Sequence, residues 1–319
     1  GESILRIRRQ GVDKETIYTC YVTKDRKLLG IITVKDLLLA EDDEMRIEDL
    51  TLEEAKALGV THLPLKVLFG EEEYLDAVTL GYLEFYEKLA VCDKLPTTSQ
   101  ASPAEFEKVF EELTANGDEV VAITVSSQLS GTYQSACIGA EEFEGKVYVV
   151  DSMNVTLGQR LVLMRGLQLA NEGFSAKEIA DKLNEEKGKV RLFAVLDTLE
   201  NLKKSGRISA ATALAGAMLS IKPAVTVEEG KVSMIGKARG AHQGNKLLRD
   251  LVEKTGGIDF EKPHTLAYSG PNDERLQKFI SESADLWEGH PQPPIATVGA
   301  VIGTHVGPGA WALAYFENE

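Results

Sequence analysis

Residues 119–132 read Glu-Val-Val-Ala-Ile-Thr-Val-Ser-Ser-Gln-Leu-Ser-Gly-Thr, and this stretch decides the fold class. Its first half is a continuous apolar run, which is typical of a strand buried in a parallel sheet. Its second half is a hydroxyl-rich loop that leads into a helical pattern at residues 133–143. Loops of this kind, between a strand end and a helix N-terminus, commonly bind anions, although Ser130 or Gly131 could equally act only as a helix cap.

The patterns on either side of this stretch predict an α/β protein with two main domains. In the first half, strand patterns at residues 60–69 and 146–150 alternate with helical patterns, which indicates a layered parallel α/β domain. In the second half, a Glu-Gly turn joins two strand patterns, so we expect an α+β domain with an antiparallel sheet. The helical patterns lie at residues 51–59, 83–89, 103–115, 157–172 and 210–219, with the end of a further helix at 182–185, and the later strand patterns lie at 192–196, 222–227, 231–237, 265–269 and 295–302.

The composition excludes several classes of function. The hydrophobic fraction of 43% and the charged fraction of 27% are those of a soluble globular protein, and no apolar run is long enough to span a bilayer. The net charge of −15 argues against a nucleic-acid partner, because phosphate contacts need a basic surface. Three cysteines without metal-like spacing and five histidines without a paired motif predict no metal site and a reducing cytoplasmic location.

The first 50 residues form a separate segment in charge and pattern. Residues 1–36 hold eight Lys and Arg against five Asp and Glu, whereas residues 37–119 hold six against 21. Within the first 50 residues, strand patterns at residues 17–22 and 28–32 lie between helical patterns at residues 4–11 and 34–39. The stretch 30–36, Gly-Ile-Ile-Thr-Val-Lys-Asp, resembles half of a CBS domain, closest to that of MgtE-type magnesium transporters. The resemblance implies that Thr33 and Asp36 could contact a nucleotide, although one unpaired copy is more often an appended piece.

Three further motifs carry polar groups that could bind an anion. Residues 96–103 read Pro-Thr-Thr-Ser-Gln-Ala-Ser-Pro, in which Ser102 is a good helix cap but three consecutive hydroxyls have no structural role. Residues 203–209 form the basic turn Lys-Lys-Ser-Gly-Arg-Ile-Ser, and residues 303–309 read Gly-Thr-His-Val-Gly-Pro-Gly. We interpret the last as a glycine-rich loop after a strand, with an imidazole that can hold or release a proton. Each motif alone also fits an ordinary turn or a solvated loop.

Taken together, these motifs resemble the DegV family of fatty-acid-binding proteins over about residues 51–319. The resemblance implies a two-domain DegV-like fold, with a CBS-like fragment at 1–50, an α/β domain at 51–157 and an α+β domain at 158–319. It also implies a carrier without catalytic activity or cofactor that encloses one long-chain fatty acid. Such proteins are similar to the FakB subunit, which presents the acid to an ATP-dependent kinase. The matching phrases lie at residues 63–70, 96–100, 129–136, 151–152, 202–209, 221–223 and 303–309.

Positions in these motifs imply the ligand-binding residues. Thr98 and Ser130 would hydrogen-bond the carboxylate, Ser99 is a neighbour, and Arg207 and His305 would complete the polar end of the site. This set agrees with the chemistry, because a carboxylate taken out of water needs several donors and a compensating charge. The resemblance also implies a kinase-docking role for one residue outside the pocket, Arg239, and Met218 and Leu219 are candidate contacts for the acyl chain.

Three departures from the DegV pattern stand out. The usual opening strand and Thr-Asp-Ser loop are absent, unless residues 45–47 replace the strand. Ala101 stands where proline is usual, and Ala77 where glycine is usual. The missing strand would expose neighbouring sheet edges.

Two alternative functions remain from the sequence. In an enzyme, either a serine hydrolase or a phosphotransferase, Ser130 and His305 could be the nucleophile and base, although neither a Gly-x-Ser-x-Gly elbow nor a phosphate-binding loop is present. A nucleotide-responsive regulator would instead act through Thr33 and Asp36.

Overall fold

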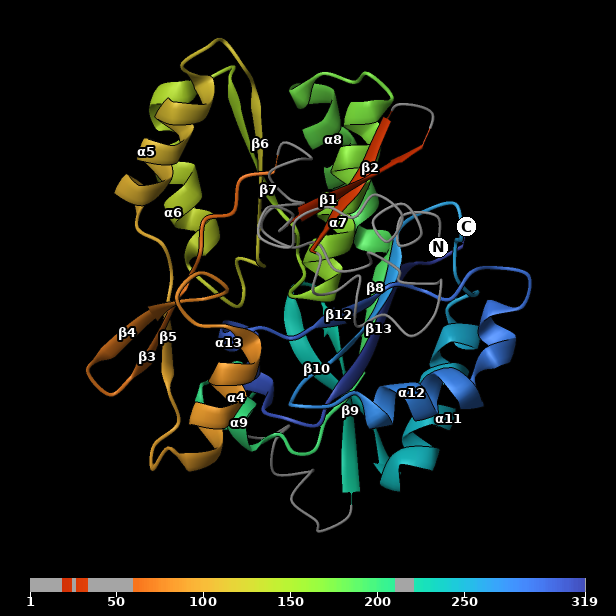
Figure 1. The fold of residues 1–319 in the computed structure, drawn as a ribbon. Coiled ribbons are helices and arrows are strands. Elements are labelled where there is room, and N and C mark those ends of the chain that lie inside the picture. Colours follow the sequence, from red (N-terminus) through yellow and green to blue (C-terminus); the bar gives the residue numbers. More distant parts are fainter. Residues whose placement is uncertain (1–18, 25–26, 34–59, 210–220, 319) are drawn as a thin grey trace, which may run out of the picture. The chain divides into compact units, whose positions relative to one another are not determined.

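The computed structural model describes residues 19–24, 27–33, 60–209 and 221–318, which divide into a first unit within residues 1–62 and a second within 63–319 (Figure 1). Several sequence predictions lie outside the described residues. They are the helices at 4–11, 34–39, 51–59 and 210–219, the substitute strand at 45–47, and the roles of Asp36, Met218 and Leu219.

The described part of the first unit is a two-stranded antiparallel sheet. Strand β1 (Thr19–Lys24) pairs with β2 (Lys27–Thr33), with a register shift between Val22 and Thr23. The two predicted strands are confirmed, although the first begins and ends two residues later than its pattern. Thr33, the candidate nucleotide contact, is the last residue of β2.

A six-stranded sheet with the order β10-β9-β8-β13-β11-β12 dominates the second unit. All neighbours pair antiparallel except β11 and β12, which are parallel, so the expected antiparallel sheet is confirmed. Glu229 and Gly230, with φ angles of 48° and 77°, form the predicted turn between β9 and β10. The strands are β8 (Val190–Val195), β9 (Ile221–Glu228), β10 (Lys231–Arg239), β11 (His264–Tyr268), β12 (Ile295–Thr297) and β13 (Trp311–Phe316).

The residues of β13 show why this sheet is covered on both faces. Trp311, Leu313 and Tyr315 belong to one apolar core, whereas Ala312 and Ala314 belong to the other. Because side chains alternate along a strand, these two sets face different helical layers, and Phe316 lies on the same side as the two alanines. Helices α11 (Gly240–Lys254) and α12 (Glu274–Glu282) cover the first face, and α7 (Leu157–Asn171) packs on the second.

The first half of the second unit adds further layers beyond α7 (Figure 1). Helices α7 and α8 (Ala176–Glu186) contact the parallel pair β6 (Val120–Thr124) and β7 (Val147–Asp151), and α5 (Pro103–Thr114) and α6 (Thr132–Gly139) lie beyond that pair. The expected α/β architecture with a parallel element is therefore confirmed. The short 3-10 helices are η1 (Glu141–Phe143), η2 (Lys187–Lys189) and η3 (Ala284–Trp287).

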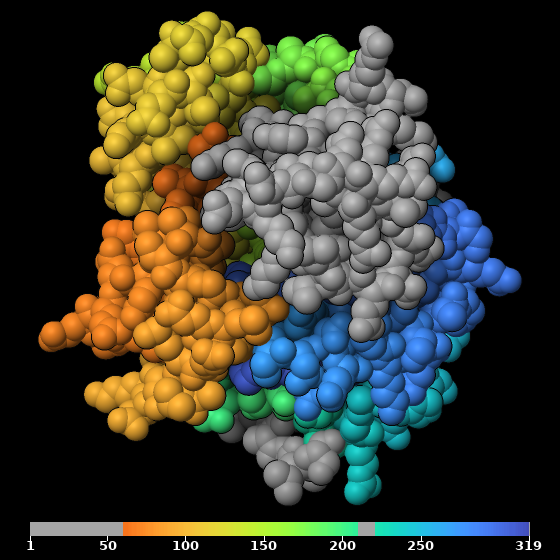
Figure 2. Space-filling model, in the orientation of Figure 1, coloured from red at the N-terminus to blue at the C-terminus, as the bar shows by residue number. Residues whose placement is uncertain are grey.

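A second small sheet has the order β4-β3-β5, and its β3–β4 hairpin projects from the surface of this unit (Figure 2). Its strands are β3 (Lys66–Phe69), β4 (Glu72–Leu75) and β5 (Thr97–Ser99), and helix α4 (Tyr82–Val91) follows the hairpin. The strand predicted at residues 60–69 is thus confirmed only in its last part. Ala77, where the DegV pattern usually has glycine, adopts a φ of 60°, the left-handed conformation that glycine adopts without strain.

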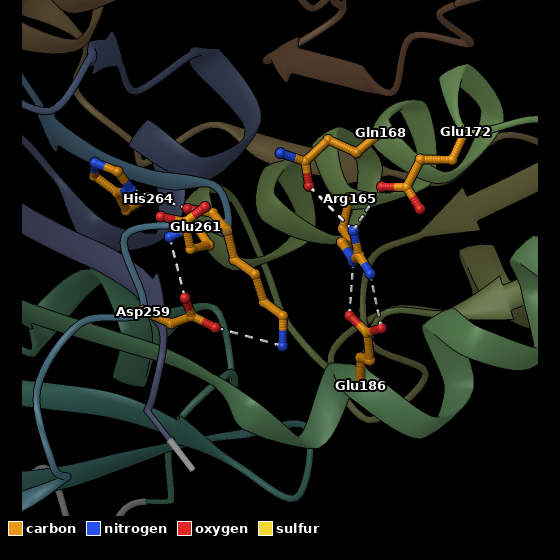
Figure 3. Close-up of polar contacts among 8 residues, drawn as sticks. Arg165, Gln168, Glu172, Glu186, Asp259, Glu261 and His264 are labelled. Atoms are coloured by element: carbon orange, nitrogen blue, oxygen red, sulfur yellow. Dashed lines mark hydrogen bonds and ion pairs between the residues drawn. The ribbon is translucent and has the colours of Figure 1, made fainter.

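An ion-pair cluster fastens α7 to α8 (Figure 3). Arg165 of α7 contacts Glu186 of α8 through two hydrogen bonds of 2.8 and 3.1 Å, and Glu172 lies 3.7 Å from the same guanidinium. The hydrogen bond to Glu186 raises the pKa of the Arg165 guanidinium and so favours its charged form further. Asp259 and Lys262 form a further pair in the loop before β11.

One predicted strand, at residues 295–302, is wrong over most of its length. Strand β12 ends at Thr297, and residues 300–306 form helix α13 (Ala300–Val306). The apolar run is too short for its period to distinguish a strand from a buried helix. The carboxylate of Asp76 accepts hydrogen bonds from the backbone N–H groups of Ala300 at 2.8 Å and Val301 at 3.0 Å, and so caps the first turn of helix α13.

Candidate functional site

His305 and Thr98 are brought into direct contact by elements 207 residues apart, with 3.0 Å between His305 Nε2 and Thr98 Oγ1. His305 therefore sits in the last turn of helix α13, not in a glycine-rich loop as the sequence suggested. Only residues 307–309 of that motif form the loop. Thr98 is the half-buried middle residue of β5, which pairs with β3 through Val67.

His305 is held neutral by its surroundings. Burial and the positive charge of Arg207 lower the pKa of this imidazole from 6.5 to about 4. Its other ring nitrogen, Nδ1, is buried and has no hydrogen-bond partner among the described residues. Thr98 has one hydroxyl proton, and the neutral His305 ring has one N–H proton. The hydrogen bond between the two side chains takes one of these protons, so the other can be donated to an anion.

Ser130 lies at the start of α6, in the loop that follows β6. Its Oγ lies 2.8 Å from the hydroxyl of Thr132 and accepts a hydrogen bond of 3.3 Å from the Thr132 backbone N–H. The N-cap of α6 is Gly131, the second of the two cap candidates, and no side chain caps this helix. The Ser130 hydroxyl remains half-buried at the end of the parallel pair, where α/β proteins bind ligands.

Arg207 joins this loop from the turn after helix α9 (Glu200–Lys204). Its Nε donates to the carbonyl oxygen of Leu129 at 3.3 Å, and its Nη1 donates to that of Ser205 at 2.6 Å. Both of its described hydrogen bonds go to carbonyl oxygens, so within the described residues no carboxylate neutralises this exposed guanidinium. An anion placed between Ser130 and His305 would lie in its field.

Two residues that the sequence did not single out hold these motifs together. The Gln100 amide donates to Ser135 Oγ of α6 at 2.9 Å, and a Cβ atom at Gly131 would lie 2.3 Å from Gln100 Oε1. The motif that contains Thr98 is thereby packed against the loop that contains Ser130. Asn201 of α9 donates to the carbonyl oxygen of Thr304 at 3.2 Å and so links the Arg207 turn to α13. In the sequence, Gln100 and Asn201 were visible only as polar residues in or beside the motifs, which did not indicate what they would contact.

The remaining candidates lie elsewhere. Ser99 is exposed and follows Thr98 on the three-residue strand β5, so its side chain points to the opposite face. Arg239 is exposed at the end of β10, where its backbone N–H donates to Gln243 Oε1 at 2.8 Å. The structure therefore joins Thr98 to His305 directly and places Arg207 against Leu129, the residue before Ser130, whereas the side chains of Ser99 and Arg239 lie outside these contacts.

The same contacts give no catalytic serine–histidine pair. Ser130 Oγ is hydrogen-bonded to the Thr132 hydroxyl, and His305 Nε2 is hydrogen-bonded to the Thr98 hydroxyl. Among the described residues, no group of three or more His, Cys, Asp or Glu side chains is arranged to hold a metal ion. In the same part of the chain, none of the helices has both the length and the apolarity that crossing a bilayer would require.

The burial of His305 should make stability depend on pH. An unfolded imidazole titrates near 6.5, whereas the folded pKa is about 4, so the unfolded state binds more protons between these values. The free energy of unfolding is thus expected to fall as the pH drops from about 6.5 to 4, by about 3 kcal/mol in full. Urea unfolding at both ends of this window should show a smaller loss for His305→Gln, and an equal loss would contradict the assignment.

Comparison with known proteins places the chain in a family. Residues 47–318 match the family model described as "Uncharacterised protein, DegV family". The chain belongs to the DegV family. Residues 1–46, which contain Thr33 and Asp36, lie outside that match.

Two relatives illustrate the range of similarity within the DegV family. A DegV domain-containing protein of Deinococcus radiodurans is 38% identical over 274 residues, covering 83% of this chain and 94% of that protein. A DegV family protein from Thermus thermophilus, described by its fatty-acid binding, is 32% identical with a TM-score of 0.74 and covers 85% of this chain and 98% of its own.

A third similar structure is that of DegV from Bacillus subtilis, described as a fatty acid binding protein. It is 29% identical, with a TM-score of 0.71, over 85% of this chain and 97% of that chain. These structures share the two-domain α/β DegV fold of the second unit.

Proposed function

We propose that this DegV protein binds one long-chain fatty acid and holds its carboxylate among Thr98, Ser130, Arg207 and His305. The observation that carries the proposal is the Thr98–His305 pair, a neutral imidazole with an unpaired buried nitrogen, which lies in the field of Arg207. Hydroxyl and imidazole donors beside one exposed arginine suit a single carboxylate. The fatty-acid binding described for the relatives from Thermus thermophilus and Bacillus subtilis supports this choice of ligand.

The acid would be bound without being chemically changed. Within residues 60–209 and 221–318, Ser130 Oγ is hydrogen-bonded to Thr132 and His305 Nε2 to Thr98, an arrangement that does not pair the serine with a base. The finer part of the proposal is that a separate ATP-dependent kinase acts on the presented carboxylate and docks at the exposed Arg239. The kinase part of the proposal is tested by measuring the rate at which the kinase phosphorylates the bound fatty acid. We expect Arg239→Glu to slow this rate without changing the affinity for the fatty acid.

The test of the binding function is direct. Purified protein is extracted with organic solvent and the extract is analysed by mass spectrometry, before and after incubation with oleate. We expect about one fatty acid per chain. A folded protein that holds no fatty acid after incubation would exclude the proposed function.

A further inference from the structure

Helix α13, which carries His305, depends on tertiary contacts for its stability and orientation. It has seven residues, and helices of this length are not stable by themselves in water. Its N-cap residue is Gly299, which has no side chain to accept hydrogen bonds from the first turn. The position of the imidazole therefore depends on groups outside the helix.

Asp76 supplies the missing cap from 224 residues away in the sequence. Its Oδ1 accepts from the N–H of Ala300 at 2.8 Å and its Oδ2 from that of Val301 at 3.0 Å. A Cβ atom at Gly299 would lie 3.0 Å from Asp76 Oδ1, so the carboxylate also fills the space beside the N-cap. A negative charge at a helix N-terminus adds a favourable interaction with the helix dipole.

Asp76 is itself held in a tight turn between β4 and α4. Its backbone N–H donates to the Leu65 carbonyl oxygen at 3.0 Å. The turn is closed by three backbone N–H groups that converge on the carbonyl oxygen of Leu75, from Val78, Thr79 and Leu80, at 3.1, 3.0 and 3.3 Å. A carboxylate on such a constrained turn has little freedom to move.

Other contacts also hold α13, but among the described residues the acceptors for its first two backbone N–H groups are the Asp76 oxygens. Ala300 and Val301 are buried in a cluster that includes Phe85 and Tyr86, and the Tyr86 hydroxyl donates to the Val298 carbonyl oxygen at 3.1 Å. In the middle of the helix, a Cβ atom at Gly303 would lie 2.5 Å from the Phe85 ring and 2.8 Å from the Tyr86 hydroxyl. At the C-terminal end, Asn201 bonds the Thr304 carbonyl oxygen. Removing the Asp76 carboxylate would leave the N–H groups of Ala300 and Val301 without these acceptors, so the first turn could shift while the packing contacts and the Asn201 hydrogen bond remain.

We propose that Asp76 is a positioning residue of the carboxylate site, which fixes α13 so that His305 meets Thr98. This inference rests on the proposed fatty-acid function, but its structural part can be tested without a ligand. Asp76 does not touch the head group in this scheme and acts only through the helix.

The test uses Asp76→Ala, which removes both acceptor oxygens, and Asp76→Asn, which keeps one. The imidazole of His305 is followed by NMR titration, with its signals assigned by their loss in His305→Gln, and oleate affinity is measured in parallel. In Asp76→Ala we expect the titration midpoint to rise by at least one pH unit, because a displaced ring is less buried. Oleate affinity should fall about tenfold, and Asp76→Asn should lie between this variant and the wild type.

A matched control is available in α8, whose N-cap Ser175 accepts from the backbone N–H of Glu178 in a capping box. Ser175→Ala removes a cap of similar kind on a helix that carries no site residue. It is expected to lower the melting temperature without moving the His305 midpoint or oleate affinity. An Asp76→Ala protein with unchanged titration and affinity would overturn the proposal.

If Asp76→Ala fails to fold, Asp76→Asn provides the test. A wild-type His305 titration midpoint and a wild-type oleate affinity in Asp76→Asn would then overturn the proposal. If the wild-type protein binds no oleate, the proposed function fails. The His305 midpoint then still decides whether Asp76 positions the ring.

Discussion

Replacing His305 by alanine is expected to weaken oleate binding by about 30-fold to 100-fold. The imidazole lies 3.0 Å from Thr98, and its buried Nδ1 has no partner among the described residues. A hydrogen bond to a charged group contributes about 1.5–3 kcal/mol, and the Thr98 hydroxyl also loses the partner that orients it. Dissociation constants from fluorescent fatty-acid displacement or calorimetry provide the measurement.

The matched control for this loss is Ser99→Ala. Ser99 belongs to the same hydroxyl-rich motif as Thr98 but is exposed on the opposite face of β5. We expect its affinity for oleate to equal that of the wild type. The proposed site would be wrong if His305→Ala bound oleate normally, or if Ser99→Ala were as defective as His305→Ala.

Replacing Gly139 by alanine is expected to lower the free energy of unfolding by about 2–3 kcal/mol. Gly139 ends helix α6 where it crosses α5, and a Cβ atom there would lie 2.7 Å from both the Pro103 carbonyl oxygen and Phe106 Cβ. Because one of these atoms belongs to the backbone, the two helices must move apart to make room. Denaturant unfolding measures the loss, which would also disturb the loop that holds Ser130.

Gly188→Ala serves as the control for the added methyl group. A Cβ atom at Gly188 would meet nothing within 4 Å, and its backbone does not adopt a positive φ. The free energy of unfolding should change by less than about 0.5 kcal/mol, since surface substitutions of this kind are nearly neutral. Similar losses for Gly139→Ala and Gly188→Ala would show that the close helix contact is not the cause.

The sequence by itself determined the fold class and most of the elements, because these follow from local patterns. Strand β6, helix α6 and the turn at Glu229 and Gly230 all arise from neighbouring residues whose periodicity or backbone preference has one main solution. The polar motifs were visible for a similar reason. Three consecutive hydroxyls, or an arginine in a glycine-containing turn, have no role in a core and therefore stand out.

Only the tertiary structure decided how the candidate site is assembled. The short apolar run at residues 295–302 did not indicate helix α13, because the residue that caps this helix, Asp76, lies in a turn 224 residues away in the sequence. The meeting of Thr98 with His305, and the outward direction of Ser99, depend on how β5 packs beside that helix. Local patterns carry no information about such contacts, since they are fixed by the packing of distant segments and by the hydrogen bonds that their backbone groups must find.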